Sequence, residues 1–520
     1  MYRRESAVPR RAPVSAPGGR GAMSKILGLI LTAIVLGLVA GGAGVAAAKH
    51  ARPGPTITHG VVVGDVTASS ALLWARTDRE ATLNVVLSGG RHGRIGRAEA
   101  ASTGDFTARL PLEHLAPGTT YRYRAWFSLG SPGSSHGPPV EGSFRTAPDD
   151  ATVAPLRLAF GGDLNGQNAC RDAAEGLPIM ETVRAWKPEV FVGLGDSIYA
   201  DNACSATGLY GNAQIPGDFG PAADLPTYWA HWRYTRADAG LQRLLEGTDY
   251  VGVWDDHEVV NDFGPLNDTR STPPYTPGVH LMPIGLRAFL DYTPVAIAEN
   301  TPLRLYRSIR WGKNLELFVL DTRQYRDPNF AEDTDAHPKT MLGREQLTWL
   351  KERLADSAAT WKVIVSSVPM SIPTGFPPTN GRDGWANFDQ TTGYERELLD
   401  ILGFMHAHGV RNSVWITTDV HFAEAFRYVP FAGDAGFRVH ELVTGPMNAG
   451  IFPTMDFDTT LNPERLAFFG PPSAGAVTSW SQAKHWFNFG ELELAHDGSL
   501  TIRIVNSTGE TEFERTLTPE

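Results

Sequence analysis

The sequence predicts two structured regions, an all-β sandwich followed by a larger α/β domain. Short β-type runs separated by turn residues extend from Thr56 to about Thr146. After the segment APDDATVAP, apolar runs alternate instead with amphipathic stretches of helical spacing. A chain of 520 residues, 42% of them hydrophobic, is long enough to bury a core in each region. We therefore expect domains at residues 56–147 and 155–520, preceded by a separate segment at residues 1–50.

The first 50 residues are expected to be an export signal or a membrane anchor. Six basic residues precede ILGLILTAIVLGLVAGGAGVAAA, an uncharged run from Ile26 to Ala48 that ends in small residues. Cleavage near Ala46 to Ala48 would make the segment a signal peptide, whereas retention would attach the protein to a membrane, because about 20 apolar residues span a bilayer. The sequence leaves these two fates open. Both predict an extracytoplasmic protein that is secreted, periplasmic or held at the cell surface.

Residues 56–147 are expected to form a small antiparallel sandwich of the immunoglobulin or fibronectin kind. The runs that predict it alternate in polarity, as at Ala71 and Leu73, and are bounded by glycine and proline. They read THGVVVGDVTASSALLWART, ATLNVVLSGG, TTYRYRAWFSLG and VEGSFRTAP. The region lacks a cluster of ligand-type residues, which favours a packing or spacer role.

Residues 155–520 alternate between strand-like and helix-like segments. The predicted strands are LRLAFGGD, VFVGLGD, DYVGVWDD, LELFVLDT, WKVIVSSV and VWITTDVH. Two segments, REQLTWLKERLADS and YERELLDILGFMHAHG, have the apolar spacing of amphipathic helices. A closing hairpin is predicted in HWFNFGELELAHDGSLTIRIVNS, with Asp497 and Gly498 at its turn.

Composition argues against nucleic acid as a partner and does not determine whether the two cysteines are oxidised. A net charge of -11 and a pI near 5.8 argue against nucleic-acid binding through general basicity. The two cysteines, Cys170 and Cys204, fit either a disulfide or two free thiols, since spacing alone does not bring their α-carbons together. Nothing in the sequence indicates an oligomeric state.

The chemical signal lies where the predicted strands end. Five apolar runs finish in aspartate, at Asp163, Asp196, Asp255 with Asp256, Asp321 and Asp419. An open α/β sheet builds its sites at the carboxyl ends of its strands. Converging carboxylates would repel one another and raise their own pKa values unless a cation held them ionised. The pattern therefore predicts a metal centre.

The remaining candidate ligands indicate which metals would fit. His257, His421 and the phenol of Tyr199 lie beside the strand-end aspartates in the sequence. Together they make a hard, oxygen-rich donor set, which suits trivalent iron or oxygen-preferring divalent ions. Gly195, before Asp196, is expected to permit a close backbone approach.

Four motifs resemble a known family. GDSIY, WDDHEVVND, LDTRQYRD and TDVH are similar, in order and position, to motifs of the PhoD-like alkaline phosphatase and phosphodiesterase family of the calcineurin-like metallophosphoesterase superfamily. The resemblance runs from about Thr56 to the C-terminus. It implies a four-layer αββα catalytic domain and a two-metal site that hydrolyses phosphomonoesters or phosphodiesters with a metal-activated water or oxide.

The resemblance also implies roles for individual residues. Asp196 would bridge both metals, and His257 would face the phosphate or protonate the leaving oxygen. The other implied ligands are Tyr199 and His421 for iron, and Asp256 and Asp419 for the second metal. Arg323 is expected to orient phosphate, although an ion pair with a neighbouring aspartate is the alternative. Glu258 and Asn261 are expected to support the site from behind.

The chain departs from the family pattern at two strand ends. Asp163, in FGGDLNGQ, stands where PhoD-like enzymes commonly carry a cysteine, and it resembles the FGDLG motif of purple acid phosphatases, whose aspartate binds iron. We therefore keep Asp163 as a ligand. Thr418 replaces the usual glycine before Asp419.

The second metal is harder to assign from the sequence. Superfamily members with zinc or manganese often have a histidine where this chain offers Ser366 and Ser367. We expect Fe(III) together with calcium, with manganese, magnesium and zinc as alternatives.

The sequence thus predicts an exported metal-dependent phosphoesterase that acts on a phosphate ester. The alternatives are a phospholipase D-like phosphodiesterase and a catalytically silent surface protein that retains the fold. Substrate identity and the preference for monoester or diester are left open, because loops choose the leaving group. His231, His406 and His408 are expected to have structural roles. The loop from Gly264 to Gly278 is either a lid or a surface excursion.

Overall fold

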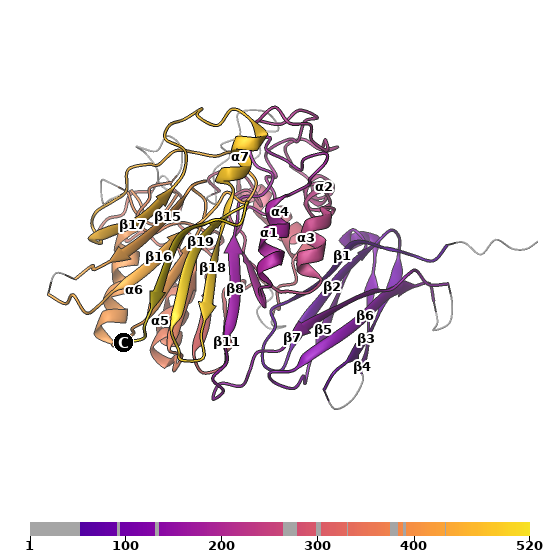
Figure 1. Ribbon diagram of the computed structural model, residues 1–520, viewed down its shortest axis with the longest axis horizontal. Coiled ribbons are helices and arrows are strands. Elements are labelled where there is room, and N and C mark those ends of the chain that lie inside the picture. Colours follow the sequence, from indigo (N-terminus) through magenta and orange to yellow (C-terminus); the bar gives the residue numbers. More distant parts are fainter. Residues whose placement is uncertain are drawn as a thin grey trace, which may run out of the picture. The chain divides into compact units, whose positions relative to one another are not determined.

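The computed structural model describes residues 53–90, 94–130, 135–263, 278–297, 303–329, 331–374, 383–387, 392–431 and 433–520. The segment expected to be an export signal or anchor lies outside these residues, and so does the loop 264–277. Within the described part of the chain, no helix is long and apolar enough to cross a membrane. The described strands form three sheets (Figure 1).

The largest sheet joins strands from both ends of the chain. Its order is β20 (Thr511–Leu517), β19 (Leu500–Asn506), β18 (Asn488–Leu494), β8 (Leu156–Gly161), β9 (Val190–Gly193), β10 (Asp249–Gly252), β1 (Ile57–Gly64), β2 (Ala71–Thr77) and β5 (Thr107–Leu112). The central strands β8, β9, β10 and β1 are parallel. Strand β18 pairs antiparallel with β8, and the predicted hairpin joins it to β19.

A second sheet of seven strands faces the first. Its order is β11 (Arg307–Trp311), β12 (Leu315–Val319), β13 (Trp361–Val365), β14 (Ser413–Thr417), β16 (Val439–Val443), β15 (Ala423–Tyr428) and β17 (Pro463–Phe469). Strands β12, β13, β14 and β16 are parallel. One apolar core holds the two sheets together, with Val192 and Leu492 from the first sheet and Val363 and Ile416 from the second.

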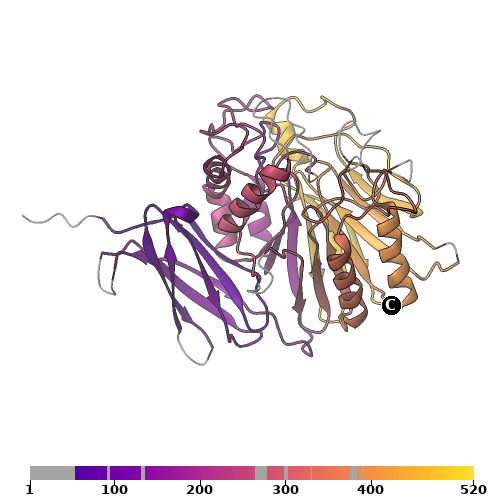
Figure 2. The ribbon, with the colours of Figure 1, turned by 180° about the vertical axis from the view of Figure 1, so that it is seen from behind.

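Helices cover the outer faces of these sheets because each helix buries one apolar side. On the nine-stranded sheet lie α1 (Ile179–Trp186), α2 (Leu225–Arg236), α3 (Ala239–Leu245) and α4 (Gly278–Tyr292), whose residues share a core with Phe191 and Tyr250. Helices α5 (Gly343–Asp356) and α6 (Glu395–Ala407) pack against Phe318 and Ile364 of the seven-stranded sheet (Figure 2). A short helix, α7 (Trp480–Trp486), precedes β18.

The β-rich N-terminal region contributes to two sheets. Strands β4 (Arg94–Ala100), β3 (Ala81–Ser88), β6 (Thr120–Ser128) and β7 (Val140–Arg145) form an antiparallel sheet of their own. They pack over β1, β2 and β5 through a core that includes Val63, Leu83 and Phe127. Because β1 also pairs in parallel with β10, with Gly64 opposite Tyr250, the N-terminal strands extend the large sheet. The 3-10 turn η1 (Ser102–Gly104) lies between β4 and β5.

A buried ion-pair network links this N-terminal region to the helices. The carboxylate of Asp105, which follows η1, accepts hydrogen bonds from Arg76, from Arg233 of α2 and from the hydroxyl of Tyr292 of α4. Burial opposes ionisation of Asp105, but these donors outweigh burial and hold its pKa below the usual value. Trp74 of β2 adds a neutral link, since its Nε1–H donates to the carbonyl of Asp291 at 2.7 Å.

Candidate metal centre

The strands predicted to end in aspartate meet at one edge of the two sheets. Asp163 follows β8, Asp196 follows β9, Asp255 and Asp256 follow β10, and Asp419 follows β14. The carboxyl ends of parallel strands are the general place for sites in α/β proteins. Each predicted strand of the α/β region is confirmed, as β8, β9, β10, β12, β13 and β14.

The backbone turns sharply at these positions. The φ angles of Asp163, Asp196, Asp419 and His421 are 62°, 50°, 81° and 61°, in the left-handed region that most side chains avoid. Such a conformation costs an L-residue roughly 1–2 kcal/mol, and aspartate tolerates it better than most. Gly195 has a φ of 114°, and a Cβ there would lie 2.6 Å from Cβ of Asp255. The close approach expected at Gly195 is therefore confirmed.

Four overlapping groups of donor atoms lie at this edge. Within each group the candidate ligand atoms are no more than 4.8 Å apart. The groups are Asp163 with Asp196 and His421, Asp196 with Asp256 and His257, Asp255 with Asp256 and Asp419, and Asp256 with Asp262 and Asp383. Asp196 belongs to two of them and Asp256 to three, so each of these carboxylates has the position that a shared ligand needs. The hydroxyl of Tyr199 lies 2.7 Å from Nε2 of His421, so all six predicted metal ligands belong to one continuous cluster.

The electrostatics of the cluster favour a bound cation. Burial, with smaller contributions from neighbouring carboxylates, raises the pKa of Asp163 to about 7 and holds those of Asp196 and Asp419 well above the usual value. Oδ1 of Asp163 and Oδ2 of Asp255 have no hydrogen-bond partner among the described residues. Buried, unpartnered carboxylate oxygens beside an imidazole and a phenol fit oxygen-preferring metal ions.

His421 is held as a neutral imidazole. Its Nδ1 donates to the carbonyl of Gly450, which leaves Nε2 with its lone pair toward Tyr199 and Asp163. Burial lowers the pKa of His421 to about 3, so the imidazole stays unprotonated. The ring of Phe452, itself 41% exposed, stacks on His421 with the ring centroids 4.7 Å apart.

His257 lies at the same edge but has a carboxylate partner of its own. Its Nδ1 is 2.7 Å from Oδ1 of Asp201, and Oδ2 of Asp201 accepts the backbone N–H of Asn261. Burial disfavours the imidazolium, but the carboxylates of Asp201 and Asp256 outweigh it and raise the pKa of His257 to about 10. Sequence reasoning missed Asp201. The only signal was its place two residues after Tyr199.

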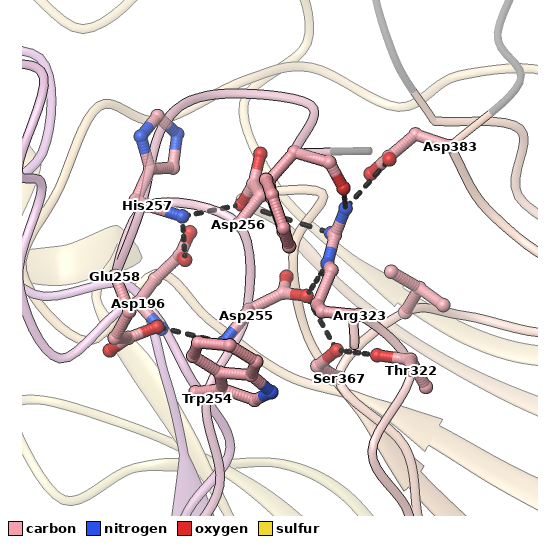
Figure 3. Close-up of polar contacts among 12 residues, drawn as sticks. Asp196, Trp254, Asp255, Asp256, His257, Glu258, Thr322, Arg323, Ser367 and Asp383 are labelled. Carbon is pink, nitrogen blue, oxygen red and sulfur yellow. Dashed lines mark hydrogen bonds and ion pairs between the residues drawn. The ribbon is translucent and has the colours of Figure 1, made fainter. Parts of the chain in front are cut away.

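Glu258 links the segments that follow strands β9 and β10 by hydrogen bonds. Its carboxylate accepts the backbone N–H groups of Asp196 at 3.0 Å and Asp255 at 2.7 Å (Figure 3). It also accepts the backbone N–H of Ser197 at 2.7 Å. Glu258 is fully buried, and burial raises its pKa to about 8 against the opposing effect of these amides. The side chain thereby fixes the segment after β9 against the segment after β10.

Arg323 is fully buried in an ion-pair network behind the cluster (Figure 3). Its Nε donates to Asp255 at 2.5 Å, and its Nη1 donates to Asp383 at 2.6 Å. Arg326 also donates to Asp383. Only Nη2 of Arg323 is left without a hydrogen bond to the described residues, and it lies 3.8 Å from Asp256. The side chain of Arg323 is therefore mainly engaged in ion pairs, which was the alternative to orienting phosphate. Its Nη2 alone lies toward the candidate ligand Asp256.

Asp321 does not join the cluster. Its Oδ1 accepts the indole N–H of Trp254 and the backbone N–H groups of Arg323 and Gln324. The inference that all five strand-end aspartates converge was therefore wrong for Asp321, which caps its own turn. Asp383 was missed, because no strand ending or spacing marks it in the sequence.

The remaining sequence-based expectations concern structural residues. Cys170 and Cys204 form a disulfide with their Cα atoms 5.9 Å apart, so the sequence's alternative of two free thiols does not apply.

The three remaining histidines have structural contacts. His231 is buried and contacts the carbonyl of Gly220, while His406 pairs with Asp434 at the C-terminal end of α6. His408 contacts the carbonyl of Phe404 in the last turn of the same helix. None of these three histidines belongs to the groups of donor atoms at the strand ends.

Two facing sheets with helices on their outer faces, and a carboxylate-rich cluster at the strand ends, define a fold that this chain shares with solved phosphatase structures. A solved structure of PhoD is similar, with a TM-score of 0.67 and 20% identity, over 89% of this chain and 92% of that chain. The purple acid phosphatase PPD1 from yellow lupin seeds has a TM-score of 0.58 and 14% identity, over 90% and 74% of the two chains. At these identities the likeness shows the fold.

The sequence comparisons identify the family. The PhoD-like phosphatase family matches residues 165–495, and the N-terminal domain of PhoD-like phosphatases matches residues 44–148. The chain belongs to the PhoD-like phosphatase family, as its motifs predicted. It is 26% identical over 404 residues to alkaline phosphatase D of Bacillus subtilis (strain 168). The match covers 70% of this chain and 64% of that protein, so this chain spans a little under two thirds of its relative's length.

Proposed function

We propose that this protein is an exported metal-dependent phosphoesterase that hydrolyses phosphomonoesters, phosphodiesters or both. The observation that carries the proposal is the cluster of Asp163, Asp196, Asp256, Asp419 and His421 at the strand ends. The four carboxylates repel one another unless cations are bound, and Asp163, Asp196, Asp419 and His421 adopt left-handed backbone conformations at the site. Family membership supports phosphate-ester chemistry, and the name of the Bacillus subtilis relative supports a hydrolase.

In this proposal the ligands divide into two sets that share Asp196. Asp163, Tyr199 and His421 hold Fe(III) with Asp196, because a phenolate and carboxylates suit a hard trivalent ion. Asp256 and Asp419 hold the second ion with Asp196. Calcium fits this second set best, since its predicted donors are all oxygens, and manganese, magnesium or zinc are the alternatives.

The bound ions would supply a water of lowered pKa and neutralise the phosphoryl oxygens. His257 donates a hydrogen bond or a proton to the leaving oxygen, and the carboxylate of Asp201 at its Nδ1 favours the protonated ring. Asp201 occupies Nδ1 and so directs Nε2 to the substrate. Arg323 acts mainly as a positioning residue, because two of its three nitrogens are committed to Asp255 and Asp383.

Export and domain organisation complete the proposal. Residues 1–50 act as a signal or anchor, residues 56–147 form an immunoglobulin-like or fibronectin-like sandwich, and residues 155–520 form a four-layer αββα catalytic domain. The disulfide between Cys170 and Cys204 supports export, because disulfides persist in oxidising compartments.

A phospholipase D-like phosphodiesterase is the second candidate. Phe452, which stacks on His421, is 41% exposed and offers an apolar surface beside the cluster. Such a surface would favour a substrate with an apolar group near the phosphate. The third alternative, a silent surface protein, is disfavoured because every predicted ligand is present in the cluster.

The test is to assay the purified protein on p-nitrophenyl phosphate, on bis(p-nitrophenyl) phosphate and on phosphatidylcholine vesicles while bound metals are quantified. Asp196→Asn is expected to lose roughly 100-fold or more in kcat/KM, because it removes a ligand shared by both ions. Asp150→Asn, an exposed carboxylate in the linker, is the matched control and should retain full activity. A metal-free, inactive protein indistinguishable from Asp196→Asn would reject the proposal, whereas activity on vesicles alone would favour the phospholipase.

A further inference from the structure

The structure places Asp163 and Thr418, the two strand-end residues at which the sequence departs from the motifs that it resembles, in direct contact. Oγ1 of Thr418 lies 2.6 Å from Oδ2 of Asp163, although the residues are 255 positions apart. The same hydroxyl lies 2.7 Å from the carbonyl oxygen of Thr444. Both side chains are fully buried. The two departures therefore form one local interaction.

A carboxylate in place of a thiolate requires an additional hydrogen-bond donor. A cysteine presents one sulfur, whereas an aspartate that binds a metal through one oxygen leaves a second buried oxygen to be satisfied. An unsatisfied buried acceptor costs about 1–3 kcal/mol. In Asp163, Oδ1 is the oxygen without a hydrogen-bond partner among the described residues, and it lies 3.9 Å from Nε2 of His421. Thr418 satisfies the other oxygen.

The backbone packs closely against this pair. Gly445 lies over it, and a Cβ there would lie 2.1 Å from Oδ2 of Asp163 and 2.7 Å from Oγ1 of Thr418. The hydroxyl carries one proton, and an ionised Asp163 is a stronger acceptor for it than the Thr444 carbonyl.

We propose that Thr418 is a positioning residue that holds Oδ2 of Asp163 and so directs Oδ1 to the iron. This contact lets an aspartate serve at a position where the family motif has a cysteine. The inference rests on the proposed function, because it assigns a role toward the metal that the cluster is proposed to bind. Beyond that function, it assigns to Thr418 the orientation of the Asp163 carboxylate.

The test measures ferric iron affinity of the full chain by competition with citrate, together with the visible absorption spectrum of the iron-loaded protein. Thr418→Val keeps the side-chain shape and removes the hydroxyl, and we expect it to bind iron about 10- to 100-fold more weakly, with a shifted spectrum. Thr418→Ser retains the hydroxyl and should stay within about threefold of the unmodified protein. Circular dichroism of the metal-free proteins checks the fold, and Thr418→Ala serves if the valine variant does not fold.

A second measurement tests whether Thr418 acts through Asp163. In an Asp163→Ala background, Thr418→Val should cause no further loss of iron affinity, because the group that it positions is gone. An undiminished loss in that background, or a Thr418→Val protein with unchanged affinity and spectrum, would overturn the inference and leave the proposed function intact. An unmodified protein that binds no ferric iron would overturn both.

Discussion

Breaking the disulfide between Cys170 and Cys204 is expected to lower the free energy of unfolding by about 4 kcal/mol. The cysteines are 34 positions apart. A cross-link closing a loop of that length removes about 12–13 cal/mol/K of chain entropy from the unfolded state, which is about 4 kcal/mol at 25 °C. The bond joins the loop after β8, which contains Asp163, to the loop after β9, which contains Tyr199.

The assay is urea unfolding followed by tryptophan fluorescence, with and without a reductant. The chain has only two cysteines, so a Cys170→Ala, Cys204→Ala protein is a matched control in which the reductant should have no effect. We expect the unmodified protein to lose most of the 4 kcal/mol on reduction and to approach the stability of the control. A change below about 1 kcal/mol would refute the argument from loop entropy.

Three further predictions concern the cluster and the N-terminal network. Glu258→Gln should weaken metal binding about 10- to 100-fold, because the amide cannot accept all three backbone N–H groups, and metal titration measures this. Tyr199→Phe should abolish the visible tyrosinate charge-transfer band of the iron-loaded protein while the fold persists, as absorption and circular dichroism would show. Asp105→Asn should lower the free energy of unfolding at pH 7 by about 3 kcal/mol, because it leaves buried arginine charge uncompensated. The pKa of Asp105 is depressed in the folded state, so this difference should be complete above pH about 4 and shrink as the pH falls below it.

Each of these predictions has its own control and contrary result. For the glutamate, the exposed Glu352→Gln on α5 should bind metal normally, and equal affinity in both variants would remove the role of Glu258. For the tyrosine, a coloured, iron-loaded Tyr199→Phe protein would mean that the phenol is not a ligand. For Asp105, unfolding measured at pH 3 is the internal control, and a stability difference that does not change with pH would contradict the ion-pair argument.

Much of the candidate site could be predicted because its signal is local in the sequence. An apolar run that ends in aspartate marks both a buried strand and the side chain at its end, so Asp163, Asp196, Asp256 and Asp419 could be named as candidates from the sequence. Tyr199 and His421 follow such strands at short spacing. The six predicted ligands lie in one cluster because parallel strands carry their carboxyl ends to the same edge.

The rest depended on contacts that no local pattern encodes. Asp383 pairs with Arg323, 60 positions away, and lies beside Asp256, yet its own place in the sequence resembles an ordinary loop. Asp321 ends an apolar run as the other aspartates do, but its carboxylate accepts the backbone N–H groups of Arg323 and Gln324 instead of joining the cluster. Strands β15 and β17 pair antiparallel at an edge of a mixed sheet, where the periodicity of a short run does not specify the partner.

The pairing of β1 with β10 has a consequence for how the protein can be divided. Strand β10 leads directly to Asp255 and Asp256, and β1 supplies its outer neighbour. A chain shortened to begin after Arg145 would expose the backbone N–H and C=O groups along that side of β10 to solvent. A bare strand edge is a template for pairing with other chains, so such a truncation should aggregate rather than yield a soluble catalytic fragment.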